Sequence, residues 1–378
     1  MNVITCSVLD VFDIHRDPLR FSAWPSVCRT RDNELLVVFS GDRLCHVDPF
    51  GKNMLVRSRD NGRTWSRPAV VNNTPLDDRD TGIIQTRTGT LLLFFFTSDT
   101  FVSWREEAKK YYGERIVESW QPAIDQVTEE VRAKYLGSFC RRSVDNGITW
   151  SDLIPTGASA PHGAVELRDG TIAYAGNEAW QGGHAVVLTV SADDGCTWTP
   201  RGLITPMDLY DNVRFYEPHL VELPDGRLLV QLRANAANPE DRFLYQAESA
   251  DQGFTWTRPE KTGIWGLPPH LFMHSSGTLV SVYGHRRKPY GQRASFSTDH
   301  GKTWGQECIL AAADHPLWDK PEDVRASAAH RHDFFYQVPD LGYPCSVELP
   351  GGEILTVFYE TARPDTPAAI KGVRWSIR

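Results

Sequence analysis

The chain has 378 residues, of which 41% are hydrophobic, so it is long enough to bury a large core. Its formal net charge of −8 argues against nucleic acid or an anionic membrane surface as the main partner. No stretch approaches eighteen consecutive apolar residues, and the seven Cys residues are scattered without CxxC pairs. These features predict no membrane span, no disulfide framework and no zinc site.

The N-terminal sequence MNVITCSVLDVFDI lacks the basic region and the continuous apolar run of a signal peptide, so we expect a cytoplasmic protein, or a secreted or periplasmic one if a leader has been removed. From residue 24 onward, a short strand, a polar turn and a very apolar strand follow one another six times. Gly lies in five of these turns, as hairpin geometry prefers. The six hairpins are expected at 24–40, 80–96, 162–176, 217–232, 269–283 and 343–359.

A second repeat, S-x-D-x-G-x-T-W, follows five of these hairpins. Its Asp can accept hydrogen bonds from backbone amides in a tight turn, and its Gly supplies a positive φ. The Trp then packs as an apolar anchor. The motif therefore predicts a hairpin turn, and we expect its Asp to be structural. The copies are 58–65, 143–150, 191–198, 249–256 and 297–304, with Asp60, Asp145, Asp193, Asp251 and Asp299.

Two hairpins per unit make a four-stranded antiparallel blade, and six such units predict an all-β, six-bladed β-propeller. We expect residues 1–378 to form this propeller as a single domain. The last unit is one strand short, and the N-terminal residues 3–11 are available to supply its outer strand.

Residues 98–137 interrupt the second unit. They are rich in Glu, Lys, Arg and Ala, with charges near i,i+4 spacing, which predicts one or two short helices. The insertion is either a solvated excursion or a wall of the substrate site. The second alternative would use its aromatic residues, which are Trp104, Tyr111, Tyr112 and Trp120.

Several polar residues lie where the inner strands begin or end. Glu217 opens the fourth inner strand, and Tyr343 opens the sixth. Arg233 follows the apolar strand of the fourth unit, and Arg293 starts the strand before the fifth motif. The first-unit loop, together with the fourth inner strand, adds four further candidates, which are Arg43, His46, Asp48 and His219.

This arrangement resembles the sialidase superfamily, the six-bladed propellers in which the S-x-D-x-G-x-T-W turns are called Asp boxes. The resemblance implies an exo-acting glycoside hydrolase that removes a terminal acidic sugar, sialic acid or a related 2-keto or uronic acid. Its partner would be a glycan or oligosaccharide, and it implies no metal or other cofactor.

The resemblance also implies residue roles. Asp48 would be the general acid and base, Tyr343 the nucleophile, and Glu217 the partner of Tyr343. Arg233 and Arg293 would bind the substrate carboxylate. Apart from the resemblance, we expect Arg43, His46 and His219 to bind substrate. A Tyr needs such a carboxylate to take its proton, because its ordinary pKa is near 10.

The chain departs from the family pattern at its first Arg. The family has this Arg immediately before the hydrophobic-Pro pair of the first blade, where this chain has Ala23 before Trp24-Pro25. Arg20 lies three residues upstream and would reach the axis only if the chain bulged. Losing one charge-assisted contact weakens carboxylate binding by about 1.5–3 kcal/mol.

Two alternatives stay open from the sequence. The first is a His-dependent lyase or hydrolase acting on glycans that contain uronic acid or rhamnose, because His side chains suit proton abstraction or metal binding. The second is a glycan-binding propeller without catalytic activity. The His residues that could meet at the axis are His46, His162, His219, His270 and His285.

Overall fold

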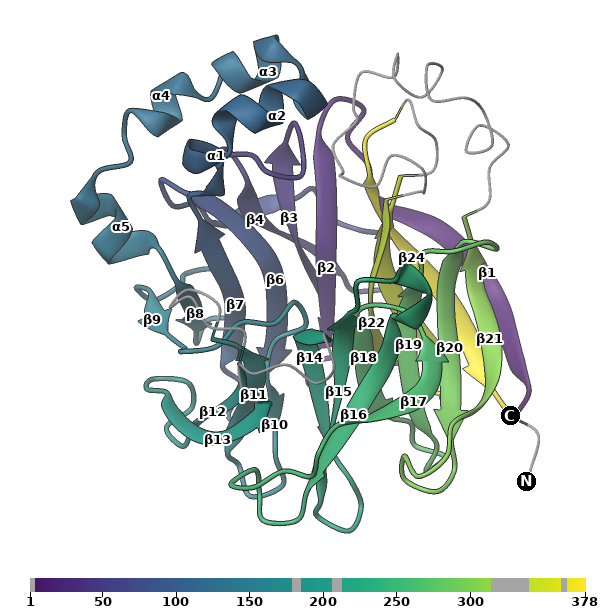
Figure 1. Cartoon of the computed structure of the whole chain (residues 1–378). Coiled ribbons are helices and arrows are strands. Elements are labelled where there is room, and N and C mark those ends of the chain that lie inside the picture. Colours follow the sequence, from purple (N-terminus) through teal and green to yellow (C-terminus); the bar gives the residue numbers. More distant parts are fainter. Residues whose placement is uncertain (1–3, 179–184, 206–212, 314–339, 362–365) are drawn as a thin grey trace.

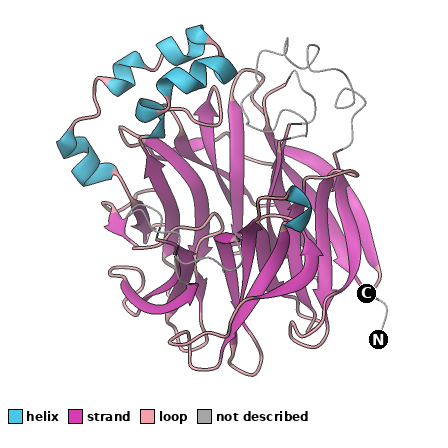
Figure 2. Cartoon of the chain, viewed as in Figure 1, coloured by secondary structure: helices cyan, strands magenta, loops and turns pink. Residues whose placement is uncertain are grey.

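The computed structural model describes residues 4–178, 185–205, 213–313, 340–361 and 366–378. These residues form six four-stranded antiparallel sheets, which surround a common axis as the blades of a propeller (Figures 1 and 2). The first strand of each blade lies innermost, and the six inner strands together line one central cavity. The predicted six-bladed propeller is thereby confirmed.

Blade one consists of β2 (Phe21–Arg29), β3 (Leu35–Arg43), β4 (Lys52–Ser58) and β5 (Ala69–Asn72). Blade two consists of β6 (Asp77–Gln85), β7 (Leu91–Ser98), β8 (Ser138–Ser143) and β9 (Ile154–Pro155). Blade three consists of β10 (Val165–Glu166), β11 (Ile172–Asn177), β12 (Val186–Ser191) and β13 (Thr199–Thr205). Blade four consists of β14 (Arg214–Glu222), β15 (Leu228–Asn235), β16 (Phe243–Ser249) and β17 (Glu260–Trp265). Blade five consists of β18 (Pro269–Met273), β19 (Leu279–His285), β20 (Gly291–Ser297) and β21 (Gly305–Ala312). Blade six consists of β22 (Leu341–Glu348), β23 (Ile354–Glu360), β24 (Ala369–Ile377) and β1 (Cys6–His15).

The N-terminal strand closes the ring. β1 pairs antiparallel with β24, and the backbone amide of Thr5 donates to the carbonyl of Arg378 at 2.8 Å. The expected closure is confirmed, although the strand begins three residues later than predicted. A disulfide between Cys6 and Cys308 also joins β1 to β21 of the fifth blade. The expectation that the Cys residues form no disulfide framework missed this bond, because 302 residues separate the pair and only ring closure brings them together.

The five Asp boxes are turns between the third and fourth strands of their blades, and they share one hydrogen-bond pattern. In the first box, Asp60 accepts the backbone amide of Thr64 at 2.9 Å and its hydroxyl at 2.6 Å. The Ser58 hydroxyl donates to Asp60 and accepts the Gly62 amide. Hydrogen bonds from Thr64 and Ser58 hold the pKa of Asp60 well below its usual range. The Asp therefore satisfies the turn backbone, as expected for a structural residue.

The insertion between β7 and β8 contains five short helices, more than the one or two predicted. They are α1 (Thr100–Ser103), α2 (Arg105–Tyr112), α3 (Glu114–Glu118), α4 (Gln121–Ile124) and α5 (Glu129–Tyr135). They project from the face of the propeller where the inner strands begin (Figures 1 and 2). Trp120 is fully buried and Tyr112 nearly so, in one apolar cluster with Cys45 and Val47 of the first-blade loop. The insertion therefore covers that loop.

Among the described residues, every helix is too short or too polar to cross a membrane.

Candidate functional site

Four inner strands carry the same bulge near their beginnings. In β2, β6, β14 and β22, two residues oppose a single residue of the neighbouring strand. The first bulged residue has a positive φ in each strand: Trp24 (53°), Asp80 (42°), Glu217 (46°) and Tyr343 (53°). Such conformations are costly for bulky side chains and are typical of functional sites. A bulge also re-aims a side chain, and here four bulges lie at the same level around the axis.

Tyr343 and Glu217 meet across the axis. The Tyr343 hydroxyl donates to Glu217 Oε1 at 2.6 Å, although 126 residues separate the two. Arg233 Nη1 donates to Glu217 Oε2 at 2.6 Å and to the Tyr343 hydroxyl at 3.4 Å. The structure thus brings together three of the residues singled out in the sequence. Burial, followed by the Glu217 charge, raises the pKa of Tyr343 well above its usual value, so its proton must pass to Glu217 before the phenol can react.

Asp80 lies close enough to this cluster for their charges to interact, and it was not among the residues singled out in the sequence. Its side chain is nearly buried, and its Oδ1 has no hydrogen-bond partner within the described part of the chain. The Asp80 carboxylate interacts electrostatically with Glu217, with Tyr343 and with the neighbouring Arg79. The available signal was positional: Asp80 opens the second hairpin, as Glu217 and Tyr343 open theirs.

Asp48 occupies a different environment, inside the loop between β3 and β4. Its side chain is fully buried. Its Oδ2 accepts the Leu44 amide at 2.5 Å, and its Oδ1 accepts the Phe50 amide at 2.9 Å. Burial raises the pKa of Asp48 to about 6. The structure therefore places Asp48 beneath the surface of its own loop, where its two oxygens bind backbone amides.

Arg43 binds the backbone of the same loop. It is fully buried, forms an ion pair with Asp77 at 2.6 Å, and donates to the carbonyls of Cys45 and His46. His46 lies closer to the axis, with its Nε2 2.9 Å from Arg79 Nη2 and its ring 4.8 Å from that of Trp24. Of these two predicted substrate-binding residues, His46 lies beside Trp24 and Arg79. The guanidinium N–H groups of Arg43 instead donate to the backbone of the loop.

The other Arg residues separate into two groups. Arg293 Nη1 pairs with Glu307 and its Nη2 donates to the Pro289 carbonyl, so its guanidinium binds within the fifth blade. Arg286 instead reaches the strand of Tyr343, where its Nε donates to the Leu341 carbonyl at 2.7 Å. Arg286 also donates to the Tyr359 hydroxyl at 3.2 Å. Arg286 contacts the strand of Tyr343 because it directly follows the apolar strand β19, whereas Arg293 lies on the next strand, β20. The substrate-binding role of Arg293 stays a prediction.

Neither Ala23 nor Arg20 supplies the missing first Arg. Ala23 is fully buried in β2. The Nε of Arg20 lies 3.6 Å from an oxygen of Asp42, and both side chains are more than one-third exposed. The chain does bulge in this strand, but the bulge turns Trp24 toward the axis instead of Arg20.

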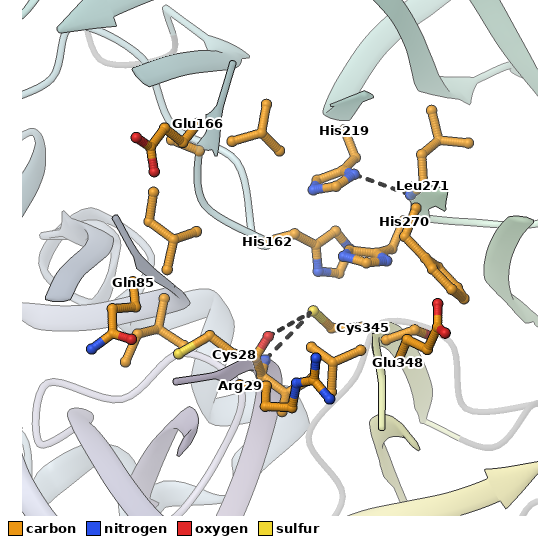
Figure 3. Close-up of a pocket in the computed structure, with 18 of the residues that line it drawn as sticks. Cys28, Arg29, Gln85, His162, Glu166, His219, His270, Leu271, Cys345 and Glu348 are labelled. Atoms are coloured by element: carbon orange, nitrogen blue, oxygen red, sulfur yellow. Dashed lines mark hydrogen bonds between the residues drawn. The ribbon is translucent and has the colours of Figure 1, made fainter. Parts of the chain in front are cut away.

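A cavity of about 460 Å³ follows farther along the same inner strands. Its lining includes His162, His219 and His270, which come from three consecutive blades and lie together at the axis (Figure 3). The rings of His219 and His270 stack at 4.2 Å, and His162 lies 5.2 Å from His270. His219 Nδ1 accepts the Leu271 amide at 3.0 Å. Predicted as a substrate-binding residue, His219 thus lines this cavity, two residues beyond Glu217.

Burial lowers the pKa of all three rings, and the pKa of His219 falls to about 3. They are therefore neutral near pH 7. Within the described ranges, no three His, Cys, Asp or Glu side chains are arranged to hold a metal ion.

A six-bladed propeller with Asp-box turns and a Tyr–Glu–Arg cluster at its axis defines a sialidase-like propeller. A family model described as "BNR repeat-like domain" matches residues 55–356, well over half of the chain. The chain belongs to this family.

Individual relatives are distant. A curated sialidase from Paraclostridium sordellii is 24% identical over 214 residues, which cover 53% of this chain. The match spans about half of that relative, 48% of its length. A solved structure from Dyadobacter fermentans, described as a protein of unknown function, has a TM-score of 0.75 and 22% identity, and the match covers 99% of both chains.

Two further solved structures share the fold at lower identity. A Hadza microbial sialidase has a TM-score of 0.62 and 15% identity, covering 94% of this chain and 65% of its own. A Penicillium chrysogenum α-L-arabinanase, solved in complex with arabinobiose, has a TM-score of 0.61 and 14% identity, covering 97% and 98% of the two chains. Similar propellers thus include enzymes that act on different sugars.

Proposed function

We propose that this protein is an exo-acting glycoside hydrolase that removes a terminal acidic sugar from a glycan. The observation that carries the proposal is the hydrogen bond from the Tyr343 hydroxyl to Glu217 Oε1, with Arg233 bound to the other Glu217 oxygen. A buried phenol whose hydroxyl points at a partly buried carboxylate is the pairing that a Tyr nucleophile requires.

In the proposed reaction the Tyr343 oxygen bonds to the anomeric carbon as the bond from that carbon to the glycosidic oxygen breaks. Glu217 takes the phenolic proton, and a general acid gives the leaving oxygen its proton. Tyr suits an acidic sugar because its hydroxyl is neutral before attack, whereas a carboxylate nucleophile would be repelled by the sugar carboxylate. Water then displaces Tyr343 from the covalent intermediate and gives one proton to the same group, now acting as a base, while the Tyr343 oxygen recovers its proton from Glu217. Two displacements at one carbon retain its configuration.

An anionic sugar is favoured by the charges around Tyr343. Arg233 lies at its hydroxyl, and Arg286 lies beside its strand. A guanidinium can bind a carboxylate through two hydrogen bonds. The sugar is sialic acid or a related 2-keto or uronic acid. Ala23 at the family's first Arg position removes one contact to a sugar carboxylate, which weighs against sialic acid itself.

The test is a panel of aryl glycosides of sialic acid, other 2-keto acids and uronic acids, hydrolysed by wild type and Tyr343→Phe. We expect the wild-type protein to cleave at least one member of the panel. NMR of the released sugar should show that the anomeric configuration is retained. Tyr343→Phe should lower kcat on that substrate by about 10³-fold or more, because the nucleophile is removed.

Tyr174→Phe is the matched control. Tyr174 is a fully buried Tyr of the third blade whose hydroxyl binds the Ala160 backbone, so we expect kcat to stay near the wild-type value. Full activity in Tyr343→Phe, or inversion of configuration, would contradict the mechanism. Release of unsaturated, ultraviolet-absorbing products would instead support the His-dependent lyase alternative.

A further inference from the structure

A glycoside hydrolase needs a group that protonates the leaving oxygen and later takes a proton from water. Asp48, which the family resemblance implies for this role, has no exposed surface. The insertion covers its loop, since the backbone amide of Val47 donates to the Tyr112 hydroxyl at 3.4 Å and both residues share one apolar cluster. For Asp48 to reach a substrate, this packing and two backbone hydrogen bonds would have to break.

Asp80 meets the geometric requirements without such a rearrangement. It occupies the bulge of β6, as Glu217 and Tyr343 occupy the bulges of β14 and β22, so its carboxyl is directed to the same axial site. Its φ of 42° is a strained conformation for a residue with a Cβ, and the bulge holds it there. Asp80 keeps 8% of its surface exposed, whereas Asp48 keeps none, and the Asp80 Oδ1 has no hydrogen-bond partner among the described residues.

We propose that Asp80 is the general acid and base of the reaction, an inference that rests on the proposed function. The Asp80 carboxyl gives its proton to the glycosidic oxygen as the bond from that oxygen to the anomeric carbon breaks and Tyr343 bonds to the carbon. The aglycone leaves as a neutral alcohol. The Asp80 carboxylate then takes one proton from the attacking water, and the Tyr343 oxygen recovers its proton from Glu217.

The surroundings of Asp80 suit both directions of this transfer. Burial raises its pKa to about 7, the positive charges of Arg79 and Arg43 lower it, and the charges of Glu217 and Asp77 raise it. The ideal pKa of a group that both donates and accepts a proton lies near the working pH. The carboxyl is therefore largely protonated in the free protein below pH 7, as a general acid must be.

The test compares two glycosides of one sugar that differ only in the leaving group, 4-nitrophenol and methanol. Methoxide leaves poorly without a proton, so Asp80→Asn should lower kcat/KM on the methyl glycoside by about 10²–10⁴-fold. The loss on the nitrophenyl glycoside should be less than about tenfold. The fall in wild-type kcat/KM above pH 7 should also disappear in Asp80→Asn.

Asp78→Asn is the matched control, because Asp78 lies on the same strand, is fully buried, and has a pKa that burial raises to about 7. Both Asp78 oxygens accept hydrogen bonds from Thr74, so its variant should keep the wild-type ratio between the two substrates. Should Asp80→Asn fail to fold, Asp80→Gly relieves the positive φ and leaves space in which added azide restores turnover of the nitrophenyl glycoside.

The outcomes are distinguishable. Equal losses on both glycosides for the Asp80 variants, or the selective loss appearing in Asp48→Asn instead, would overturn the assignment of Asp80 and leave the hydrolase proposal standing. A wild-type protein that cleaves no member of the panel would overturn the hydrolase proposal and this inference with it.

Discussion

Single residues at the axis hold strained conformations that the rest of each blade enforces. Trp24, Glu217 and Tyr343 have positive φ values and each precedes a Pro. Such backbone strain costs about 1–3 kcal/mol per residue and persists only where the surroundings impose it. Here the flanking residues remain paired in the sheets on both sides of each bulge. The strain is therefore local, and it turns three large side chains toward one point.

Glu217 is expected to be essential to the reaction. Glu217→Gln should lower kcat by about 10²–10⁴-fold, because an amide cannot take the Tyr343 proton. It also leaves Arg233 without its carboxylate partner. The measurement is kcat on the best glycoside of the panel, with folding checked by circular dichroism. Glu222→Gln, at the other end of the same strand, is the control and should keep wild-type activity; an equal loss in both variants would argue against the role.

The sequence was sufficient to find some site residues and insufficient for others. Glu217 and Tyr343 stand out because each is a polar residue directly before Pro at the start of an apolar hairpin. Asp80 has no Pro after it, so its bulge becomes visible only in the register of β6 and β7. The burial of Asp48 depends on packing against a distant insertion, which no local pattern encodes.

At the scale of the elements, the Asp boxes join neighbouring blades. A Cβ added to Gly195 would lie 2.7 Å from Leu92 of the preceding blade. The same addition to Gly253 would lie 2.1 Å from Leu188, again one blade back. The indole nitrogen of Trp304 donates to Gln246 of the fourth blade at 2.8 Å. Each of these boxes thus packs its turn against the preceding blade. This close contact is a second reason for Gly in the turn, in addition to its positive φ.

Two Gly substitutions separate backbone strain from this contact. Gly226 has a φ of 89° and open space around a new Cβ, so Gly226→Ala should destabilise by about 1–2 kcal/mol through strain alone. Gly253 has a φ of 93°, and Gly253→Ala should cost about 1–3 kcal/mol more because it meets Leu188. Denaturant unfolding measures both. Equal destabilisation of the two variants would show that the contact between blades contributes nothing.

Among the elements, the strands were predictable and the helices were less so. The strands form a repeat, and each of the six hairpins supports the assignment of the others. The insertion has no such repeat, and its five helices have four to eight residues each. Isolated helices this short are marginal in water, so tertiary packing determines where they begin and end.

At the scale of the whole molecule, the axis carries three buried neutral His rings from three blades. His162 is 2% exposed, and neither ring nitrogen has a partner within the described residues. Burial lowers its pKa in the folded protein well below the ordinary value of 6.5. Below about pH 6.5, His162 is therefore protonated in the unfolded chain but stays neutral in the folded protein.

This difference makes stability sensitive to acid. The contribution of a neutral His162 is fully present above pH 6.5 and is lost as the pH falls from 6.5 toward the folded-state pKa, by up to about 1.4 kcal/mol per pH unit. His162→Gln should therefore lose less stability than wild type between pH 6.5 and pH 5, as measured by urea unfolding. His300→Asn, at a half-buried position of the fifth Asp box where the φ of 61° suits Asn, is the control and should follow the wild-type curve. Parallel curves for wild type and His162→Gln would refute the account.

The disulfide between Cys6 and Cys308 determines what happens to the propeller when the chain is cut between these two residues. The helices of residues 100–135 lie between the two Cys residues, so a protease that cuts there yields one fragment with Cys6 and another with Cys308. The fragments remain a single covalent molecule, and β1 remains paired with β24. A cut in the insertion and reduction of the disulfide must therefore both occur before the two fragments can diffuse apart.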